Sequence, residues 1–279
     1  MAFLAPTVLV FAAFSWWPIV GAVRLSFQKT NLVTPAHWVG TDNFRRVLDD
    51  PLFGTAVRNT AVFTALDLLI WFPVAVLLAV VISELTRAGA LYRTLVYLPV
   101  VIPPVVGVLL WKTFYDSDYG LFNDILGLVG LGPYPWLQDS TWALPSLVLQ
   151  HVWASLGGAV LIFIAALANV QRELYEAAEI DGAKVRHRFW HITLPQMRGV
   201  LLVMFLLQAI GLFQIFTEPF VMTNGGPADS TITILQLIYR YGFEYGQYGT
   251  AAAASVMLAV VLCLLSAVYL WATRKWGSR

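Results

Sequence analysis

The densest group of charged side chains lies between residues 172 and 195, where acids come first and bases follow. Glu173, Glu176 and Glu179 recur every third residue around two alanines, which favours a short helix. Gly182 suits a left-handed helix end, after which a second short helix can begin. The pattern predicts a compact helix–turn–helix with an acidic edge that binds a groove on another protein. The alternative is an ordinary charged loop.

Three ionisable side chains stand inside long apolar stretches: Asp67, His151 and Glu218. Such residues mark ion or proton pathways in many membrane proteins. Here they are too sparse to form a convincing proton relay. Asp67 and His151 are therefore candidate functional residues, and hydrogen bonding between neighbouring helices is the alternative.

The sequence argues against an enzyme. A phosphate-binding loop needs Gly-Lys ahead of Ser or Thr, and the residues before the four lysines are Gln28, Trp111, Ala183 and Arg274. No nucleophile constellation is visible. The pair His187 and His191 has helical spacing but lacks a third metal ligand.

Composition indicates which elements hold these residues. Apolar residues make up 59% of the chain and charged residues 12%, which is typical of an integral membrane protein. A bilayer core needs about 20 apolar residues per helix. We expect a single membrane domain, 1–279, with a retained first helix rather than a cleaved signal peptide. The expected spans are 3–23, 61–82, 95–114, 142–168, 200–221 and 250–272.

Basic residues indicate the orientation of the spans. The predicted loop 115–141 contains acids and no Lys or Arg, whereas 169–198 contains Lys184 and four arginines. By the positive-inside rule, this contrast places both termini in the cytoplasm. The first outer loop, 24–59, runs against the rule because it is also basic. The net charge of +1 gives no indication of nucleic-acid binding.

The charged segment resembles the coupling motif of ABC-importer permeases: Glu-Ala-Ala, three residues, Gly, nine residues, Ile, one residue, Leu-Pro. Further stretches, at 39–45, 97–103 and 223–231, resemble carbohydrate-uptake permeases of the maltose type. Pro195 is expected to break the pattern just before the fifth span. The ATPase-coupling residues that the resemblance implies are Glu176, Ala177, Ala178, Asp181, Gly182, Ile192, Leu194 and Pro195.

The resemblance implies an all-α, six-helix transmembrane bundle of the ABC type I importer permease kind, in the plasma membrane of a bacterium. The chain would form half of a translocation pathway for an oligosaccharide or a related polyol. Its implied partners are a second permease, two ATPase subunits that bind ATP and Mg, and an extracellular solute-binding protein; the chain itself would hold no cofactor. The alternatives are a secondary transporter or channel, and a membrane enzyme or scaffold.

In maltose-type relatives, the helices before and after the coupling loop line the sugar site. Sugar recognition uses amides, hydroxyls and aromatic platforms. The candidate substrate-binding residues are therefore His151, Ser155, Gln208 and Gln214, with Trp111 and Trp153 as candidate platforms. Hydrogen bonding between helices is the alternative for each polar residue, and packing is the alternative for the two tryptophans.

Overall fold

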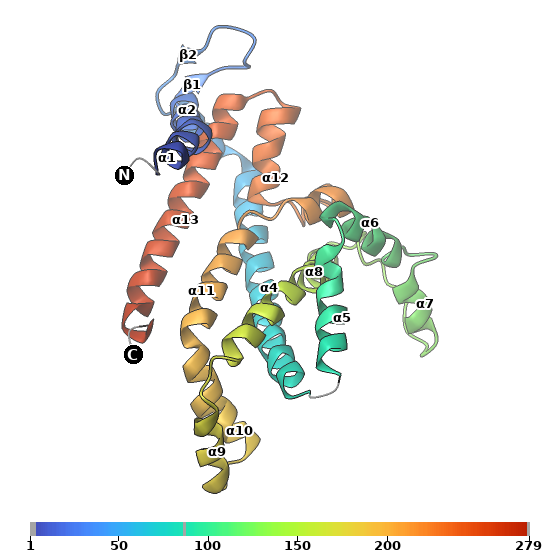
Figure 1. Cartoon of the computed structure of the whole chain (residues 1–279). Helices are drawn as coiled ribbons and strands as arrows, with labels where there is room; N and C mark the ends of the chain where they lie inside the picture. Colours follow the sequence, from blue (N-terminus) through green and yellow to red (C-terminus); the bar gives the residue numbers. More distant parts are fainter. Residues whose placement is uncertain (1–3, 86–87, 278–279) are drawn as a thin grey trace.

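The computed structural model describes residues 4–85 and 88–277, and these residues are almost entirely helical (Figure 1). The labels α, η and β denote α-helices, π-helical turns and strands. In chain order they are α1 Ala5–Phe11, η2 Ala12–Trp16, α2 Trp17–Ser26, β1 Gln28–Lys29, β2 His37–Trp38, α3 Asp42–Asp49, α4 Pro51–Glu84, α5 Gly89–Val101, α6 Pro104–Phe114, α7 Leu121–Gly127, α8 Ala143–Leu167, α9 Arg172–Ile180, α10 Val185–Arg188, η3 Phe189–Thr193, α11 Leu194–Leu212, η4 Pro219–Thr223, α12 Ile234–Tyr239, η5 Arg240–Glu244 and α13 Tyr248–Gly277.

Within the described ranges, 5 helices are long and apolar enough to cross a membrane, and a bent pair raises the number to 6. The predicted six-helix membrane bundle is thus confirmed as a fold class. The bent pair, α5 and α6, replaces the single helix expected at 95–114, and its two halves meet at 96°. Pro103 and Pro104 explain the break, because the residue before a proline is disfavoured in a helix.

Two other spans differ from the expected bounds by more than five residues. Helix α4 begins at Pro51 rather than at residue 61, because Asp50 caps it by accepting a hydrogen bond from Leu52 N at 2.8 Å. Helix α11 covers 194–212 rather than 200–221. The apolar run beyond residue 212 folds into a turn and η4, and hydropathy alone does not reveal where an apolar helix ends. The expected start of the first span at Phe3 lies outside the described residues.

The main core lies between α4 and α8. Phe63, Trp71 and Phe163 are almost fully buried there, and small residues such as Ala75 let the two helices approach closely. Lipid is as apolar as these side chains, so van der Waals packing rather than the hydrophobic effect holds such helices together. A second cluster joins α3, α12 and the start of α13 at the opposite end from α9.

Gly157 on α8 sets the distance between α8 and α5. A Cβ atom at this position would overlap the Val96 carbonyl oxygen and would lie 2.9 Å from Tyr97 Cα. We expect Gly157→Ala to push α5 away and to destabilise the protein by about 1–3 kcal/mol, as other overpacked cores are. Thermal unfolding in detergent should therefore occur at a lower temperature.

The adjacent glycine provides a matched control for this prediction. A Cβ atom at Gly158 would meet nothing within 4 Å. Gly158→Ala should leave the unfolding temperature unchanged or raise it slightly, because alanine favours the helix. Equal effects of the two substitutions would contradict the role assigned to Gly157.

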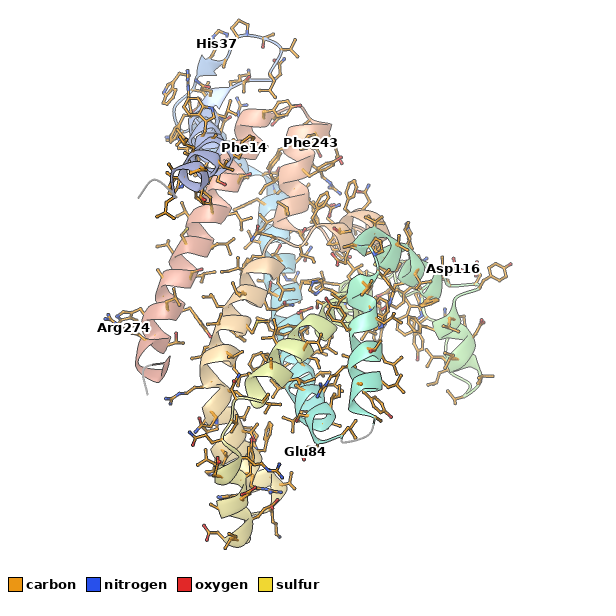
Figure 2. The ribbon with its side chains drawn as sticks, viewed as in Figure 1. Phe14, His37, Glu84, Asp116, Phe243 and Arg274 are labelled. Atoms are coloured by element: carbon orange, nitrogen blue, oxygen red, sulfur yellow. The ribbon has the colours of Figure 1, made fainter. Side chains whose placement is uncertain are left out.

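Different elements project from the two opposite ends of the helical bundle (Figure 1). Helices α9 and α10 project beyond the bundle at one end, and the β1–β2 hairpin projects at the other. Helix α13 runs from the β end toward the α9 end, so Arg274 lies on the side of α9 (Figure 2). The first helical segment, α1 to α2, is seen nearly end-on and crosses α13. The cytoplasmic placement of both termini stays a prediction.

Candidate coupling hairpin and a polar cluster between the spans

The predicted helix–turn–helix is present, and we call residues 172–193 the coupling hairpin. Helix α9 ends in a Schellman motif, in which Ala183 N donates to Ala178 O at 2.8 Å and Gly182 N donates to Glu179 O at 3.0 Å. Gly182 has a φ of 74°, so it adopts the left-handed conformation that the sequence predicted.

Side-chain contacts hold the two arms of the hairpin together. Arg188 forms an ion pair with Glu179 across the turn. The Tyr175 hydroxyl and Thr193 Oγ1 lie 2.9 Å apart and share a hydrogen bond, and Thr193 is buried at the base of α11. The hairpin is thus connected to a membrane helix through both its backbone and its side chains. Movement of its tip would be transmitted to α11.

Pro195 does not interrupt the helix, and the expectation that it breaks the pattern is wrong. It occupies the first turn of α11, and α10, η3 and α11 together form a continuous helical run of 28 residues, Val185–Leu212. Pro195 lacks the N–H that would bond to the preceding turn, and a π-helical turn can accommodate this loss inside a helical run. The π-helical turn η3 precedes it. Ile192 and Leu194 are half-buried at this junction, whereas Pro195 is exposed.

The hairpin exposes large apolar side chains to solvent among its charged ones. The exposed fractions are 88% for Ile180, 71% for Val185 and 58% for Trp190. Trp190 also lines a hollow of about 780 Å³ between the two arms, together with Ala178, Gly182 and Lys184. Exposed apolar side chains on a segment that projects beyond the membrane helices are typical of a protein-binding surface.

The remaining predicted coupling residues lie on this surface or beside it. Glu176 is exposed, and its carboxylate lies 3.2 Å from Arg172 Nε, one helical turn earlier. Ala177 and Asp181 are exposed, and Ala178 is half-buried. His187 and His191 stack with ring centroids 4.0 Å apart. The described part of the chain contains no cluster of three or more metal-ligating side chains around them.

A second group of functional candidates meets between the spans, and we call it the polar cluster: Asp67, His151 and Gln208. His151 Nδ1 lies 2.7 Å from Asp67 Oδ2, and Gln208 Nε2 donates to Asp67 Oδ1 at 3.1 Å. Asp67 is fully buried, and the His151 side chain is 18% exposed. The cluster links α4, α8 and α11, and an ionised carboxylate makes both hydrogen bonds stronger.

The other predicted sugar-site residues do not join the polar cluster. Ser155 Oγ donates to His151 O, and Gln214 Nε2 donates to Ile210 O, so both bonds stay within one helical turn. Trp111 and Trp153 pack on each other, with centroids 5.4 Å apart. Trp111 is only 7% exposed. Its ring is therefore a packing element in this conformation.

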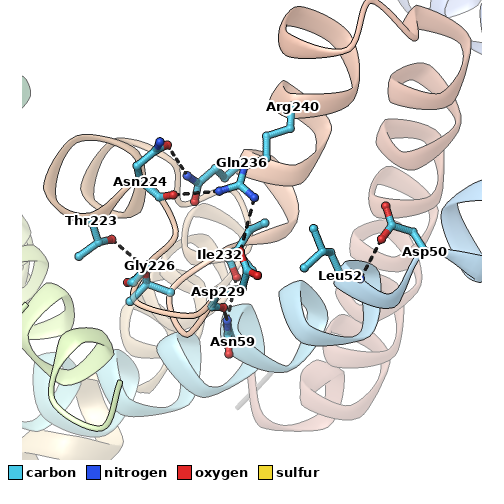
Figure 3. A network of polar contacts seen from close by, with 11 residues as sticks. Asp50, Leu52, Asn59, Thr223, Asn224, Gly226, Asp229, Ile232, Gln236 and Arg240 are labelled. Carbon is cyan, nitrogen blue, oxygen red and sulfur yellow. Dashed lines mark hydrogen bonds and ion pairs between the residues drawn. The ribbon is translucent and has the colours of Figure 1, made fainter. Parts of the chain in front are cut away.

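Sequence reasoning missed a polar network at the end opposite the hairpin (Figure 3). Asn59 Nδ2 donates to Asp229 O at 2.9 Å and to Ile232 O at 3.1 Å, which ties α4 to a loop 170 residues away. Arg240 donates to Asn224 O at 2.9 Å and lies 3.6 Å from the Asp229 carboxylate. In the sequence, this region is marked only by the stretch 223–231, which resembles carbohydrate-uptake permeases, because the partners in the network are distant in the chain.

Loop carboxylates at the same end are held by backbone groups. The N–H groups of Tyr119 and Asp118 hold the pKa of Asp116 below its usual range. The N–H of Thr141 does the same for the pKa of Asp139, just before α8. Asp116 is exposed and Asp139 is half-buried, and both act as local turn-forming groups.

A helical membrane bundle with a projecting coupling hairpin defines a class: a transport subunit that takes its driving force from another protein. Residues 58–277 match the family described as "Binding-protein-dependent transport system inner membrane component", and the chain belongs to this family. It is the membrane-spanning permease subunit of an ABC importer.

Individual relatives cover almost the whole chain. The arabinooligosaccharides transport permease AraP of Halalkalibacterium halodurans is 33% identical over 97% of this chain and 86% of its own length. The lactose transport permease LacF of Rhizobium radiobacter is 32% identical over 98% of this chain and 93% of its own length. A chain of a bacterial alginate ABC transporter, solved with an alginate pentasaccharide-bound periplasmic protein, has a TM-score of 0.88 and 26% identity, and the match covers 99% of this chain and 94% of that chain.

Proposed function

We propose that this permease imports a sugar, either an oligosaccharide or a related polyol. A second permease would complete the pathway, and two ATPase subunits would bind ATP and Mg on the side of the coupling hairpin. A solute-binding protein would deliver the sugar at the opposite end. The relatives named above are described as carriers of arabinooligosaccharides, lactose and alginate, which supports a carbohydrate substrate.

The coupling hairpin carries the proposal. Its glycine-capped turn, its connection to α11 and its exposed apolar surface are what a lever driven by another protein requires. Glu176 would pair with a basic group of the ATPase, and Ala177 would permit close approach. Closure of the ATPase dimer on ATP would then move α11 and the bundle between two states.

The first helical segment supports a partner within the membrane. None of the most apolar window in Ala5–Ser26 is buried inside this chain, whereas 44% of the corresponding window of α8 is buried. Lipid can cover such a surface, and so can a second permease. We assign part of this surface to the second permease.

The polar cluster is the proposed contact with the sugar. A carboxylate, an imidazole and an amide together provide the acceptors and donors that hydroxyl groups recognise. In this conformation their hydrogen bonds are directed at each other. Sugar binding would exchange some of these bonds for bonds to hydroxyl groups when the pathway opens.

Reconstitution tests the proposal. Proteoliposomes with both permeases, the ATPase and the sugar-loaded binding protein should accumulate radiolabelled sugar only when ATP is present. Omission of the ATPase or of ATP should abolish uptake, because this chain provides the pathway and not the energy. Uptake by this permease alone, without ATP, would instead identify a secondary transporter or channel.

A further inference from the structure

A polar pocket of about 400 Å³ lies at the end of the folded molecule opposite the coupling hairpin. It is formed by the β1–β2 hairpin, α3 and the start of α13, and we call it the outer basic pocket. Its walls include Lys29, Thr30, His37, Arg46, Gln247 and Thr250. Two of these residues, Lys29 and Arg46, belong to the basic stretch 24–59 that runs against the positive-inside rule.

The positive charge of this pocket is not balanced by its own walls. No acidic residue lines it, and neither Lys29 nor Arg46 forms an ion pair within the described residues. Lys29 pairs directly with His37 in the two-stranded ribbon. This cross-strand pairing places two nitrogen-bearing side chains of the pocket next to each other.

Buried contacts fix the backbone of the pocket, while the Lys29 and Arg46 side chains are exposed. Asn43 is almost fully buried, and its Nδ2 donates to Ser26 O at 2.9 Å and to Gln28 O at 3.0 Å, which fixes strand β1 against α3. A Cβ atom at Gly249 would overlap Gln28 O. Only glycine at the start of α13 therefore allows β1, and with it Lys29, to approach so closely.

The pocket also offers neutral donors. Asn31 Oδ1 already accepts hydrogen bonds from Val33 N, Thr34 N and Thr34 Oγ1, which leaves its Nδ2 group available as a donor. Together with Lys29 and Arg46 this gives several donors around one space. Such a set suits the two oxygens of a carboxylate.

The rim of the pocket favours a protein as the source of that carboxylate. Val33 and Trp38 on the β1–β2 hairpin are 88% and 66% exposed. Figure 2 places His37 at the extreme end of the molecule, beyond the spans. Trp and Arg side chains are enriched at the energetically important positions of protein interfaces. The family to which this chain belongs depends on a binding protein.

We propose that the outer basic pocket receives acidic side chains of the solute-binding protein when it docks on the importer. This inference rests on the proposed function, and it adds the residues and the charge of the docking site. Lys29, Arg46 and the rim would attract the acidic surface of the binding protein before contact and bind its carboxylates after docking. Charge complementarity of this kind raises association rates and fixes orientation.

Binding-protein-stimulated ATP hydrolysis tests the inference. The whole importer in nanodiscs is titrated with its sugar-loaded binding protein, as wild type and as Lys29→Glu/Arg46→Glu. The variant should need at least about tenfold more binding protein for half-maximal stimulation. Its basal rate and its rate at saturation should stay close to those of the wild type. High salt should weaken stimulation of the wild type more than that of the variant.

Two further variants complete the test. Arg45→Glu/Arg58→Glu makes the same change of charge on exposed outer residues that do not line the pocket, and should shift the titration less than about twofold. Lys29→Gln/Arg46→Gln is a milder change. It should raise the binding-protein concentration for half-maximal stimulation by less than the Glu variant does, and it should unfold at the wild-type temperature.

The outcomes separate this inference from the proposed function. An equal shift in the control variant, or no shift in the pocket variant, overturns the pocket while leaving the importer assignment in place. Dependence of the basal rate on anionic lipid in the nanodisc, lost only in the pocket variant, overturns it in favour of a lipid phosphate. A wild-type importer that does not respond to its binding protein overturns both.

Discussion

Gly182→Val is expected to abolish ATP-driven sugar uptake while leaving membrane insertion intact. Gly182 has a φ of 74° and lies at the left-handed position of the Schellman motif. A β-branched residue there costs about 1–3 kcal/mol, which corresponds to a loss of correctly shaped hairpin by a factor of about 5 to 150. No atom would lie within 4 Å of the new Cβ, so the effect comes from the backbone and from docking rather than from a clash within this chain.

The chain contains a matched control for this prediction. Gly130, in the loop after α7, also has a φ of 74°, and a Cβ atom there would meet nothing within 4 Å. Gly130→Val should cost similar local strain but leave uptake largely intact, because Gly130 lies outside the coupling hairpin. Gly182→Asn should retain part of the uptake, since asparagine tolerates the left-handed region.

Uptake into proteoliposomes and co-purification of the ATPase measure these effects together. Loss of uptake in Gly182→Val should coincide with weaker retention of the ATPase on the permease. Wild-type uptake in Gly182→Val, or equal loss in Gly130→Val, would show that the turn does not transmit work from the ATPase.

The local features of the coupling hairpin were predictable from sequence because they depend on neighbouring residues. A glycine after an alanine-rich helix indicates a left-handed end, and both partners of each capping hydrogen bond lie within five positions of each other. Pro195 was misinterpreted for a related reason. Proline is unfavourable inside a regular α-helix, and the sequence alone does not show that a π-helical turn at Phe189–Thr193 lets the helical run continue through Pro195.

Contacts between segments that are distant in the sequence were harder to predict. Asp67 and His151 were each recognised as unusual in an apolar stretch, but their contact across 84 residues follows from the packing of α4 on α8. The outer basic pocket was visible only as a loop that ran against the positive-inside rule. The pocket forms because strand β1 approaches Gly249 closely. Gly249 lies far from Lys29 in sequence but lines the same pocket.

Asp67→Leu is expected to destabilise the bundle and to abolish uptake. The fully buried carboxylate accepts one hydrogen bond from Gln208 and pairs with His151, and it connects three membrane helices. Each bond to a charged group contributes about 1.5–3 kcal/mol in soluble proteins, and polar contacts in membrane proteins average nearer to about 0.6 kcal/mol. We therefore expect a loss of about 1–3 kcal/mol, measured as a lower unfolding temperature in detergent.

Thr64 gives the matched control, since it is buried on the same helix and its hydroxyl has no hydrogen-bond partner. Thr64→Val should leave stability unchanged or raise it, because no hydrogen bond is lost.

Asp67→Asn distinguishes a structural role from a role in sugar contact. Asparagine preserves the shape of the side chain and one hydrogen-bond acceptor. If the polar cluster is purely structural, this variant should lose only part of its stability, and the KM for sugar uptake should be that of the wild type. If Asp67 contacts the sugar, the KM for uptake should rise while ATP hydrolysis stays coupled to transport. A wild-type KM in a stable Asp67→Asn importer would refute the proposed sugar contact.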